Sequence, residues 1–305
     1  MRMAPLIRRC APPSPRRAGR RSSWVDYTSS VKALLLALLP LIAAPLGAAY
    51  ASRDVVFPIA GRATGSDGRL FFTALWITNP SESDAVEATL TFRPAAEKLP
   101  ARVSPLHLAP GETRVLDPLD VDGLGALRIT ATKDVLASAR LYSRMPGESN
   151  ARRVATSFSA VPVQFAIGSG ESATLQGVTP ADGRYKIYLA EVAGMPLDIS
   201  VSLVDPRGIT ISEKRLYVDK ERQVTVDVAE LFPLFTSGTA TVRVNGVNGS
   251  GRVVVAGSAI ARESQDSSPF EMSFATASRD RMGFLEALTY IAVAAAAGVA
   301  LFLRR

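Results

Sequence analysis

Two apolar segments bracket this chain of 305 residues and constrain its fold more than any other feature. The first covers residues 33–51, and the second covers residues 287–303, directly before Arg304-Arg305. Between them, residues 52–286 contain no cysteine, because the single cysteine of the chain is Cys10. The stability of this intervening part therefore has to come from packed cores rather than from disulfide bonds.

The first apolar segment has the parts of a secretory signal peptide. Lys32 precedes a run of leucines and alanines that ends on Ala49-Tyr50-Ala51, a small-x-small cleavage sequence. We expect a signal peptide over residues 31–51 and cleavage between Ala51 and Ser52. The alternative is an uncleaved membrane helix, but two prolines and a glycine interrupt a segment that would need about 20 apolar residues to span a bilayer.

Residues 1–30 form a basic leader. Residues 1–32 carry a net charge of +7, which equals the net charge of the whole chain. The remainder is balanced, so the basic character does not indicate a nucleic-acid partner. Two explanations of the leader stay open. Arg20-Arg21 belongs to a twin-arginine export signal, or translation starts later, at Val31.

The second apolar segment predicts a transmembrane helix. Residues 287–303 carry no charge, and at 1.5 Å per residue they would span about 26 Å. The terminal Arg304-Arg305 fits the positive-inside rule, which places this pair in the cytoplasm. We expect a short spacer over residues 278–286. A buried C-terminal helix is one alternative, and a sorting tail removed by a surface protease is another, although residues 278–283 lack the motifs of such tails.

Most residues between the apolar segments alternate or run apolar over strand lengths. The expected strands are 69–78, 85–92, 126–132, 135–143, 199–204, 223–228, 239–245 and 252–260. Turn residues such as Asn79-Pro80 and Pro110-Gly111 separate them. Short strands at such intervals are typical of all-β, antiparallel sandwiches.

An internal repeat organises these strands. Residues 106–117 align with residues 216–227, and residues 126–144 align with residues 240–262, so the spacing is roughly 110 residues. The order of elements is the same in both parts. We therefore expect two tandem domains of one fold, over residues 52–162 and 163–277.

Several strings resemble the immunoglobulin-like β-sandwich modules found, often in tandem, in secreted and surface proteins of soil bacteria. They are LWITNP at 75–80, LAPGETRVLD at 108–117, GALRIT at 125–130 and, for the partner module, GSGESATL at 168–175. The resemblance covers most of residues 54–276. It implies two tandem antiparallel immunoglobulin-like β-sandwiches in an extracellular setting. Together with the apolar segments, it places these domains between a signal peptide and a C-terminal transmembrane helix. Because the shared strings are turns and strands, it implies no catalytic or binding residue.

Two of these strings have a physical explanation. In Ala109-Pro110-Gly111-Glu112, proline presets φ and glycine supplies a positive φ, so the chain can turn there. In residues 75–80, Trp76 is expected to fill the core between two sheets, and Asn79-Pro80 is expected to end the strand. A platform for a sugar ring at Trp76 is the functional alternative.

The residue inventory argues against catalysis and leaves one metal candidate. His107 is the only histidine, and the chain has no G-x-S-x-G nucleophile motif. Sites built from several histidine or cysteine ligands are excluded by count. Asp117, Asp120 and Asp122 form a weak calcium candidate that lacks the closing glutamate of a helical calcium loop. A polar connection between two strands is the simpler interpretation.

Two further clusters have simple explanations. A basic cluster comprises Arg140, Arg144, Arg152 and Arg153. Glu148 lies among these arginines and aromatic residues are few, so we expect no nucleic-acid site. Asn248-Gly249-Ser250 matches a glycosylation sequon, but Asn-Gly is also a strong hairpin signal, and we favour the hairpin.

These observations predict a non-enzymatic cell-envelope protein without a cofactor. It would be exported and anchored in the cytoplasmic membrane, with its β-domains on the extracytoplasmic side. One hypothesis is a binding or adhesion role toward a protein or a polysaccharide, and the other is a structural or assembly subunit of an envelope system. A binder should expose an apolar or aromatic patch, whereas a structural subunit should expose strand edges.

We predict that translation begins at Val31 rather than at Met1. A GTG codon at Val31 would then give a short signal peptide that starts M-K-A-L-L-L. Mass spectrometry of the precursor should find no peptide from residues 3–30. Detection of any such peptide in the cell contradicts the later start.

Overall fold

The computed structural model describes residues 51–65, 68–95, 99–148, 154–180, 183–261 and 267–274. Within these ranges the chain is all-β and forms three antiparallel sheets. The expected leader (1–30), spacer (278–286), transmembrane helix (287–303) and terminal arginines (304–305) lie outside the described residues, as does the expected signal peptide apart from Ala51. No helix within the described ranges is long and apolar enough to cross a membrane.

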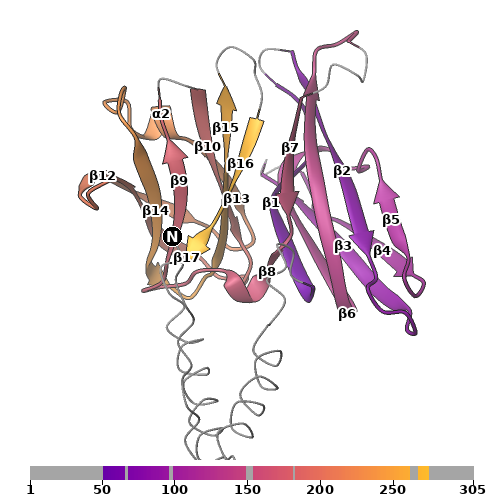
Figure 1. Ribbon diagram of the computed structural model, residues 1–305. Coiled ribbons are helices and arrows are strands. Elements are labelled where there is room, and N and C mark those ends of the chain that lie inside the picture. The colour runs from indigo at the N-terminus through magenta and orange to yellow at the C-terminus, as the bar shows by residue number, and fades with distance from the viewer. Residues whose placement is uncertain are drawn as a thin grey trace, which may run out of the picture. The chain divides into compact units, whose positions relative to one another are not determined.

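The first half, residues 51–162, forms one eight-stranded sheet (Figure 1). Its strands are β1 (Ser52–Thr64), β2 (Leu70–Thr78), β3 (Val86–Pro94), β4 (Arg102–Leu108), β5 (Thr113–Leu116), β6 (Gly123–Arg144), β7 (Val154–Ser159) and β8 (Val161–Pro162). The order is β4-β3-β6-β1-β2-β5, with β7 on β6 and β8 on β1. The sequence predicts two strands where β6 is one strand of 22 residues. Its first part pairs with β1 and β3 and its second part with β2 and β7, so the sheet curls around one core.

The curl is fixed where β1 changes partner. β1 pairs with β6 as far as Arg62, and from Arg62 to Thr64 it pairs with β2. Gly61 has a φ of 125°, and a Cβ there would lie 2.1 Å from the carbonyl oxygen of Gly123, so only glycine fits. The Thr73 hydroxyl accepts a hydrogen bond from the Gly61 N–H (2.8 Å) and donates one to the Gly61 carbonyl (3.1 Å).

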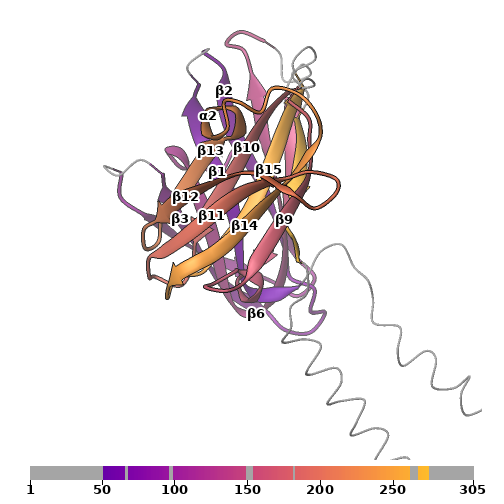
Figure 2. The same cartoon turned by 90° about the vertical axis from the view of Figure 1, so that its left-hand side faces the viewer.

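The second half, residues 163–274, forms two sheets. Its elements are η2 (Val163–Phe165), β9 (Ser172–Val178), β10 (Gly183–Glu191), β11 (Leu197–Val204), β12 (Thr210–Val218), β13 (Gln223–Asp227), α2 (Val228–Leu231), β14 (Ala240–Gly249), β15 (Val253–Ala261), β16 (Ser267–Glu271) and β17 (Ser273–Phe274). The orders are β13-β10-β15-β16, which we name the shared sheet, and β12-β11-β14-β9-β17, the outer sheet. Figure 2 shows the outer sheet toward the viewer and the shared sheet behind it.

The strand pairings of the first half recur in the second half. β2 pairs with β5 and with the second part of β6, as β10 pairs with β13 and β15. β3 pairs with β4 and with the first part of β6, as β11 pairs with β12 and β14. β1, β7 and β8 correspond in the same way to β9, β16 and β17. The main difference is that β6 is continuous, whereas β14 and β15 lie in different sheets.

The correspondence reaches individual turns. The predicted turn at Ala109-Pro110-Gly111-Glu112 is confirmed, because Gly111 has a φ of 68° and the Glu112 N–H donates to the Ala109 carbonyl (3.0 Å). This geometry is a type II turn. In the second half, Glu221 takes the place of Gly111. It has a φ of 56°, and no other residue besides glycine has a positive φ within the described ranges.

Asn79 ends β2, as the sequence predicts, and ties this strand end to two loops. Its side chain is fully buried. The amide nitrogen Nδ2 donates to the carbonyls of Asp84 (2.7 Å) and Ala109 (2.9 Å), and Oδ1 accepts from the Ser81 N–H (3.0 Å). The amide of this buried side chain therefore has its hydrogen-bonding groups satisfied by the backbone of the two loops.

Glu191 occupies the corresponding position at the end of β10. It is 5% exposed, and its carboxylate accepts four backbone N–H bonds. Oε1 accepts from Ala193 (2.6 Å) and Arg252 (3.1 Å), and Oε2 accepts from Gly194 (2.9 Å) and Glu221 (2.7 Å). The bond from the Glu221 N–H stabilises the left-handed backbone of Glu221. Gly111 adopts the same conformation in the first turn without strain and needs no such bond.

Trp76 lies outside the core, so the expectation that it fills the space between two sheets was wrong. Alternation along β2 buries its neighbours Leu75 and Ile77 completely and turns Trp76 to the opposite face. There the guanidinium carbon of Arg140 lies 5.6 Å from the centre of the Trp76 ring, which is a cation–π contact.

The shared sheet is buried on both faces. One face contributes Ile187, Leu189 and other apolar residues to the core of the second half. From the other face, Tyr188 and Ala256 join the core of the first half. Also on that face, Ala190 and Val254 pack with Val56 of β1 in a third cluster. The shared sheet therefore completes the core of the first half as well as its own.

We predict that Asn79→Ala lowers the free energy of unfolding by about 2 to 3 kcal/mol, because the buried side chain is truncated and its hydrogen bonds to both loops are lost. Urea unfolding of the two proteins measures the difference. Ser83→Ala serves as the control, since the Ser83 hydroxyl bonds only to the exposed Asp84 side chain. Equal stability of Asn79→Ala and wild type would contradict the role of this side chain.

The stability contributed by Glu112 should depend on pH. Its carboxylate accepts from the Ala109 N–H (2.7 Å) and from Arg114 Nη2 (2.6 Å), and these bonds lower the pKa of Glu112. A carboxyl whose pKa is lowered by folding stabilises the protein above its unfolded pKa of about 4.3 and loses this contribution as pH falls through the folded pKa. Glu112→Gln should therefore destabilise the protein near neutral pH, and the difference from wild type should vanish in acid.

Urea unfolding at a series of pH values tests this dependence. Glu82→Gln is the control, because Glu82 is exposed and forms no hydrogen bond or ion pair with the described residues. Its effect should be small at every pH. A difference between wild type and Glu112→Gln that stays constant from neutral to acid pH would refute the mechanism.

Candidate binding cleft between the two halves

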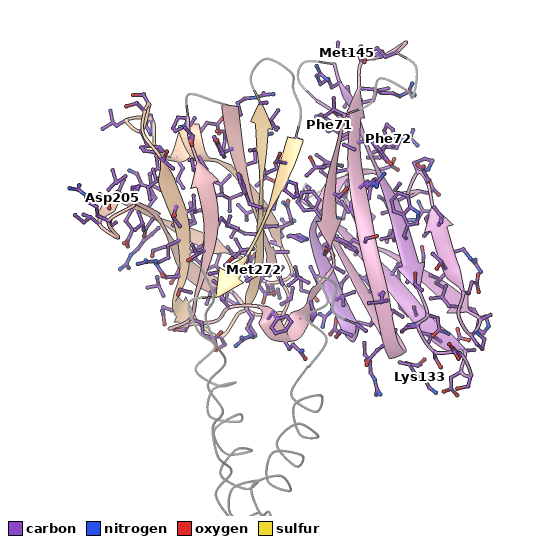
Figure 3. The ribbon with its side chains drawn as sticks, in the orientation of Figure 1. Phe71, Phe72, Lys133, Met145, Asp205 and Met272 are labelled. Carbon is purple, nitrogen blue, oxygen red and sulfur yellow. The ribbon has the colours of Figure 1, made fainter. Side chains whose placement is uncertain are left out.

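A cleft of about 260 Å³ opens between the curled sheet of the first half and the shared sheet. The wall from the first half includes Ile59, Leu141 and Phe158, whose side chains also belong to or pack on the core of that half. Phe71 of β2 lines the cleft as well, while its neighbour Phe72 points to the other face and stacks on Tyr142 with ring centres 5.3 Å apart (Figure 3). Thr64, Arg69, Ser143 and Thr156 line the same side, so this wall combines apolar and polar side chains.

The opposite wall comes from β10, β13 and β15 of the shared sheet. Tyr188 and Ser258 are nearly buried, and their hydroxyl groups are 2.9 Å apart. The ring of Tyr188 meets Phe158 edge to face, with centroids 6.2 Å apart and planes at 86°. Burial raises the pKa of the Tyr188 hydroxyl, so this group stays protonated near neutral pH, and either hydroxyl of the pair can be the donor.

Three basic side chains line the cleft, and no described lining residue is acidic. They are Arg69, which directly precedes β2, and Arg184 and Lys186 of β10. Lys186 forms no salt bridge with any residue of the described ranges. Asp227 pairs with it in the strand register, but its carboxylate caps α2 by accepting from the Ala229 N–H (2.9 Å). The cleft thus combines apolar surface with positive charge.

Away from the cleft, polar contacts hold the two halves together. Arg128 of β6 binds both carboxylate oxygens of Asp54, at 2.8 and 2.6 Å, and donates to the Val192 carbonyl of the second half (3.0 Å). The bond to Asp54 is the largest cause that raises the pKa of Arg128. Arg93 Nη2 pairs with Glu221 Oε1 across the same boundary at 2.7 Å. These contacts connect the two halves beside the apolar contacts between β1 and the shared sheet.

The structure does not bring the three candidate calcium ligands together. Asp120 forms an ion pair with Arg102 at 2.7 Å. Asp117 and Asp122 line a separate hollow that Arg62 also lines. Among the described residues, no three acidic, histidine or cysteine side chains are grouped as a metal site.

The other sequence candidates lie apart from the cleft. His107 Nδ1 is 2.5 Å from Glu87 Oε1 on the neighbouring strand, and both side chains are exposed. Arg144 donates to the Glu148 carbonyl (2.8 Å), while Arg152 and Arg153 lie outside the described residues. Ser52 is the first residue of β1, so the expected cleavage after Ala51 falls where the sheet begins.

The hairpin expected at Asn248-Gly249 was wrong. β14 ends at Gly249 in the outer sheet, and β15 begins at Val253 in the shared sheet, so the two strands do not pair. The connection crosses between sheets. Gly249 has a φ of 117°, and a Cβ there would lie 2.6 Å from the Pro196 carbonyl oxygen, which explains the glycine.

Sequence reasoning missed Lys186, Tyr188 and Ser258. Their signal is weak but real. In residues 184–190, Tyr185, Ile187 and Leu189 alternate toward one face, yet the other face also carries Tyr188 and Ala190. A strand that is apolar on both faces is typical of a sheet covered on both sides.

Comparison with known proteins gives no relative from which a function could be transferred. No family model matches the chain, and no curated protein matches it. A solved structure from Parabacteroides distasonis, described as a "putative secreted protein", aligns with a TM-score of 0.17 and 8% identity, over 73% of this chain and 88% of that one. A superposition of this quality carries no argument about fold, location or function.

Proposed function

We propose that this chain is a non-enzymatic cell-envelope protein whose extracytoplasmic part binds a ligand in the cleft between its two halves. Export by the segment over residues 31–51 and anchoring by a helix over residues 287–303 are parts of the proposal, and the sequence patterns described above support them. The observation that carries the binding role is the cleft itself. Binding sites favour concave, mostly apolar places with a few convergent polar groups, such as the mouth of a curled sheet.

We also propose that both halves are immunoglobulin-like β-sandwiches. In immunoglobulin sheets the second strand pairs with the fifth, and the third pairs with the sixth. The pairings of β2 with β5 and of β3 with the first part of β6 have this order, and β10, β13, β11 and β14 repeat it. Two features depart from that pattern. β1 pairs with β6 before it reaches β2, and the second part of β6 and its counterpart β15 pair with β2 and β10, whereas the last strand of an immunoglobulin domain lies beside the sixth.

The groups around the cleft favour binding over catalysis. The described lining contains hydroxyl groups and cations but no carboxylate or imidazole that could serve as a general base. Tyr188 is a poor base because burial keeps its hydroxyl protonated. Uncharged hydroxyl donors and fixed positive charges suit recognition of a ligand.

A structural or assembly role is the alternative, and the strand edges weigh against it. Assembly through strand addition needs an edge with free backbone groups and no obstacle. The edge strand β4 contains Pro105 at an inner pairing position. The edge strand β12 places Lys214 opposite the fully buried Val201 and has a register shift at Leu203/Val204. Proline, inward charges and irregular register are devices that block edge pairing.

Thr225→Trp tests the cleft as the binding site. Thr225 lies on the edge strand β13 opposite Tyr188 and lines the cleft, so an indole there should occupy the space of the ligand. We expect the full chain, purified from a membrane fraction, to carry a small molecule that mass spectrometry detects at a fixed ratio to protein. The Thr225→Trp variant should lose most of it.

Val115→Trp is the matched control. Val115 of β5 is the residue of the first repeat that corresponds to Thr225. It pairs with Trp76 of β2 and is 48% exposed on a face outside the cleft. This variant should retain the molecule at the ratio of the wild type. Equal loading of Thr225→Trp and Val115→Trp would refute binding in the cleft.

A further inference from the structure

The lining of the cleft also defines the chemistry of the ligand that it would accept. On the side of the first half, the partly exposed Phe71 and Leu141 lie over the buried Ile59 and Phe158, next to polar residues such as Ser143 and Thr156. Contact with the apolar side chains of this wall favours an apolar body, since burial of apolar surface is the dominant source of binding free energy.

The charge of the lining narrows the ligand further. Lys186 lies beside this wall without a salt bridge to any described residue. Its strand partner Asp227 caps α2, although the charge of this carboxylate also acts on Tyr188. An ammonium group against apolar surface is poorly solvated, and a counter-ion there interacts more strongly than it would in water. An anionic group on the ligand would supply that counter-ion.

Hydroxyl groups adjoin this charge. Ser258 is the direct strand partner of Lys186, and its hydroxyl is paired with that of Tyr188. Phe158 touches the edge of the Tyr188 ring. The charge of Lys186, the hydroxyl groups of Ser258 and Tyr188, and the ring of Phe158 thus lie next to one another. A small molecule can contact all of them at once.

We propose, as an extension of the proposed binding role, that the cleft takes a small molecule with an apolar body and one anionic head group, a carboxylate or a phosphate. The head group lies against Lys186 and the hydroxyl groups of Ser258 and Tyr188. The apolar body lies along Phe158 and Leu141 toward the core of the first half. Arg69 and Arg184 also line the cleft.

Calorimetric titration of the full chain with probes of equal length and different head groups tests the proposal. The probes are octanoate, octyl phosphate, octan-1-ol and octylammonium. Octanoate or octyl phosphate should bind to wild type more tightly than octan-1-ol, and octylammonium should bind least. The order of the first two tells a carboxylate site from a phosphate site.

Variants assign the effect to Lys186. Lys186→Gln should weaken the anionic probes about 10-fold and leave octan-1-ol unchanged, since it removes charge and keeps most of the side chain. Lys186→Arg should restore most of the affinity for the anions. Lys214→Gln removes a lysine from β12 in the outer sheet and should change nothing.

Two outcomes overturn the proposal. One refutes only the ligand class, and the other also refutes binding in the cleft. If octan-1-ol or octylammonium binds as tightly as the anions, and Thr225→Trp abolishes that binding, the ligand class is wrong and the binding cleft stands. If no probe binds in a way that Thr225→Trp reduces, the binding cleft fails as well. If Lys186→Gln weakens the binding of octan-1-ol as much as the binding of octanoate, the substitution acts through the structure of the cleft. That result also refutes the head-group assignment.

Discussion

Because β10 and β15 carry apolar side chains on both faces, the shared sheet has to be covered twice, and the rest of the architecture follows from this requirement. The outer sheet covers one face and the curled sheet of the first half covers the other. Tyr188 makes this dependence concrete, since it belongs to the second half by sequence and to the core of the first half by packing. Burial of a side chain of this size contributes about 2 kcal/mol. The first half therefore relies on the second for part of its core.

The same arrangement explains why a cleft forms where it does. The curled sheet leaves a seam, and the shared sheet covers it with Tyr188 and Ala256 but leaves Leu141 and Phe71 in contact with a hollow. In the second half the corresponding seam is filled from within. Phe270 of β16 stacks on Tyr185 with ring centres 5.8 Å apart and packs in the core of that half. The second half thus covers its own core with β16, whereas the core of the first half is covered by the shared sheet of the second.

Local patterns predicted part of the secondary structure but little of the site. The expected ranges coincide with seven of the 17 strands that the structure describes and miss β1 and β10, while the Pro-Gly turn at Gly111 has the expected backbone. Alternation does not predict which side chains face the core when both faces of a strand are buried, as in β10. Trp76 was assigned inward on account of its size, whereas the alternation of Leu75 and Ile77 decides the matter. The continuity of β6 depends on partners far away in the sequence, and so does the pairing of β15 with β10 rather than β14. The cleft is a product of the packing of the halves, which no local pattern encodes.

The exchange of Gly111 for Glu221 has a consequence for how these repeats can be combined. A glutamate in left-handed backbone is strained, and the bond from its N–H to Glu191 offsets that strain. The same glutamate then presents a carboxylate to Arg93 across the boundary between the halves. The first repeat has glycine at this place and Asn79 instead of Glu191, so it lacks both the carboxylate and its support. The two repeats are therefore not exchangeable modules. A chain assembled from two copies of the first repeat would lack the ion pair between Arg93 and Glu221 that joins β3 of one repeat to the turn of the next.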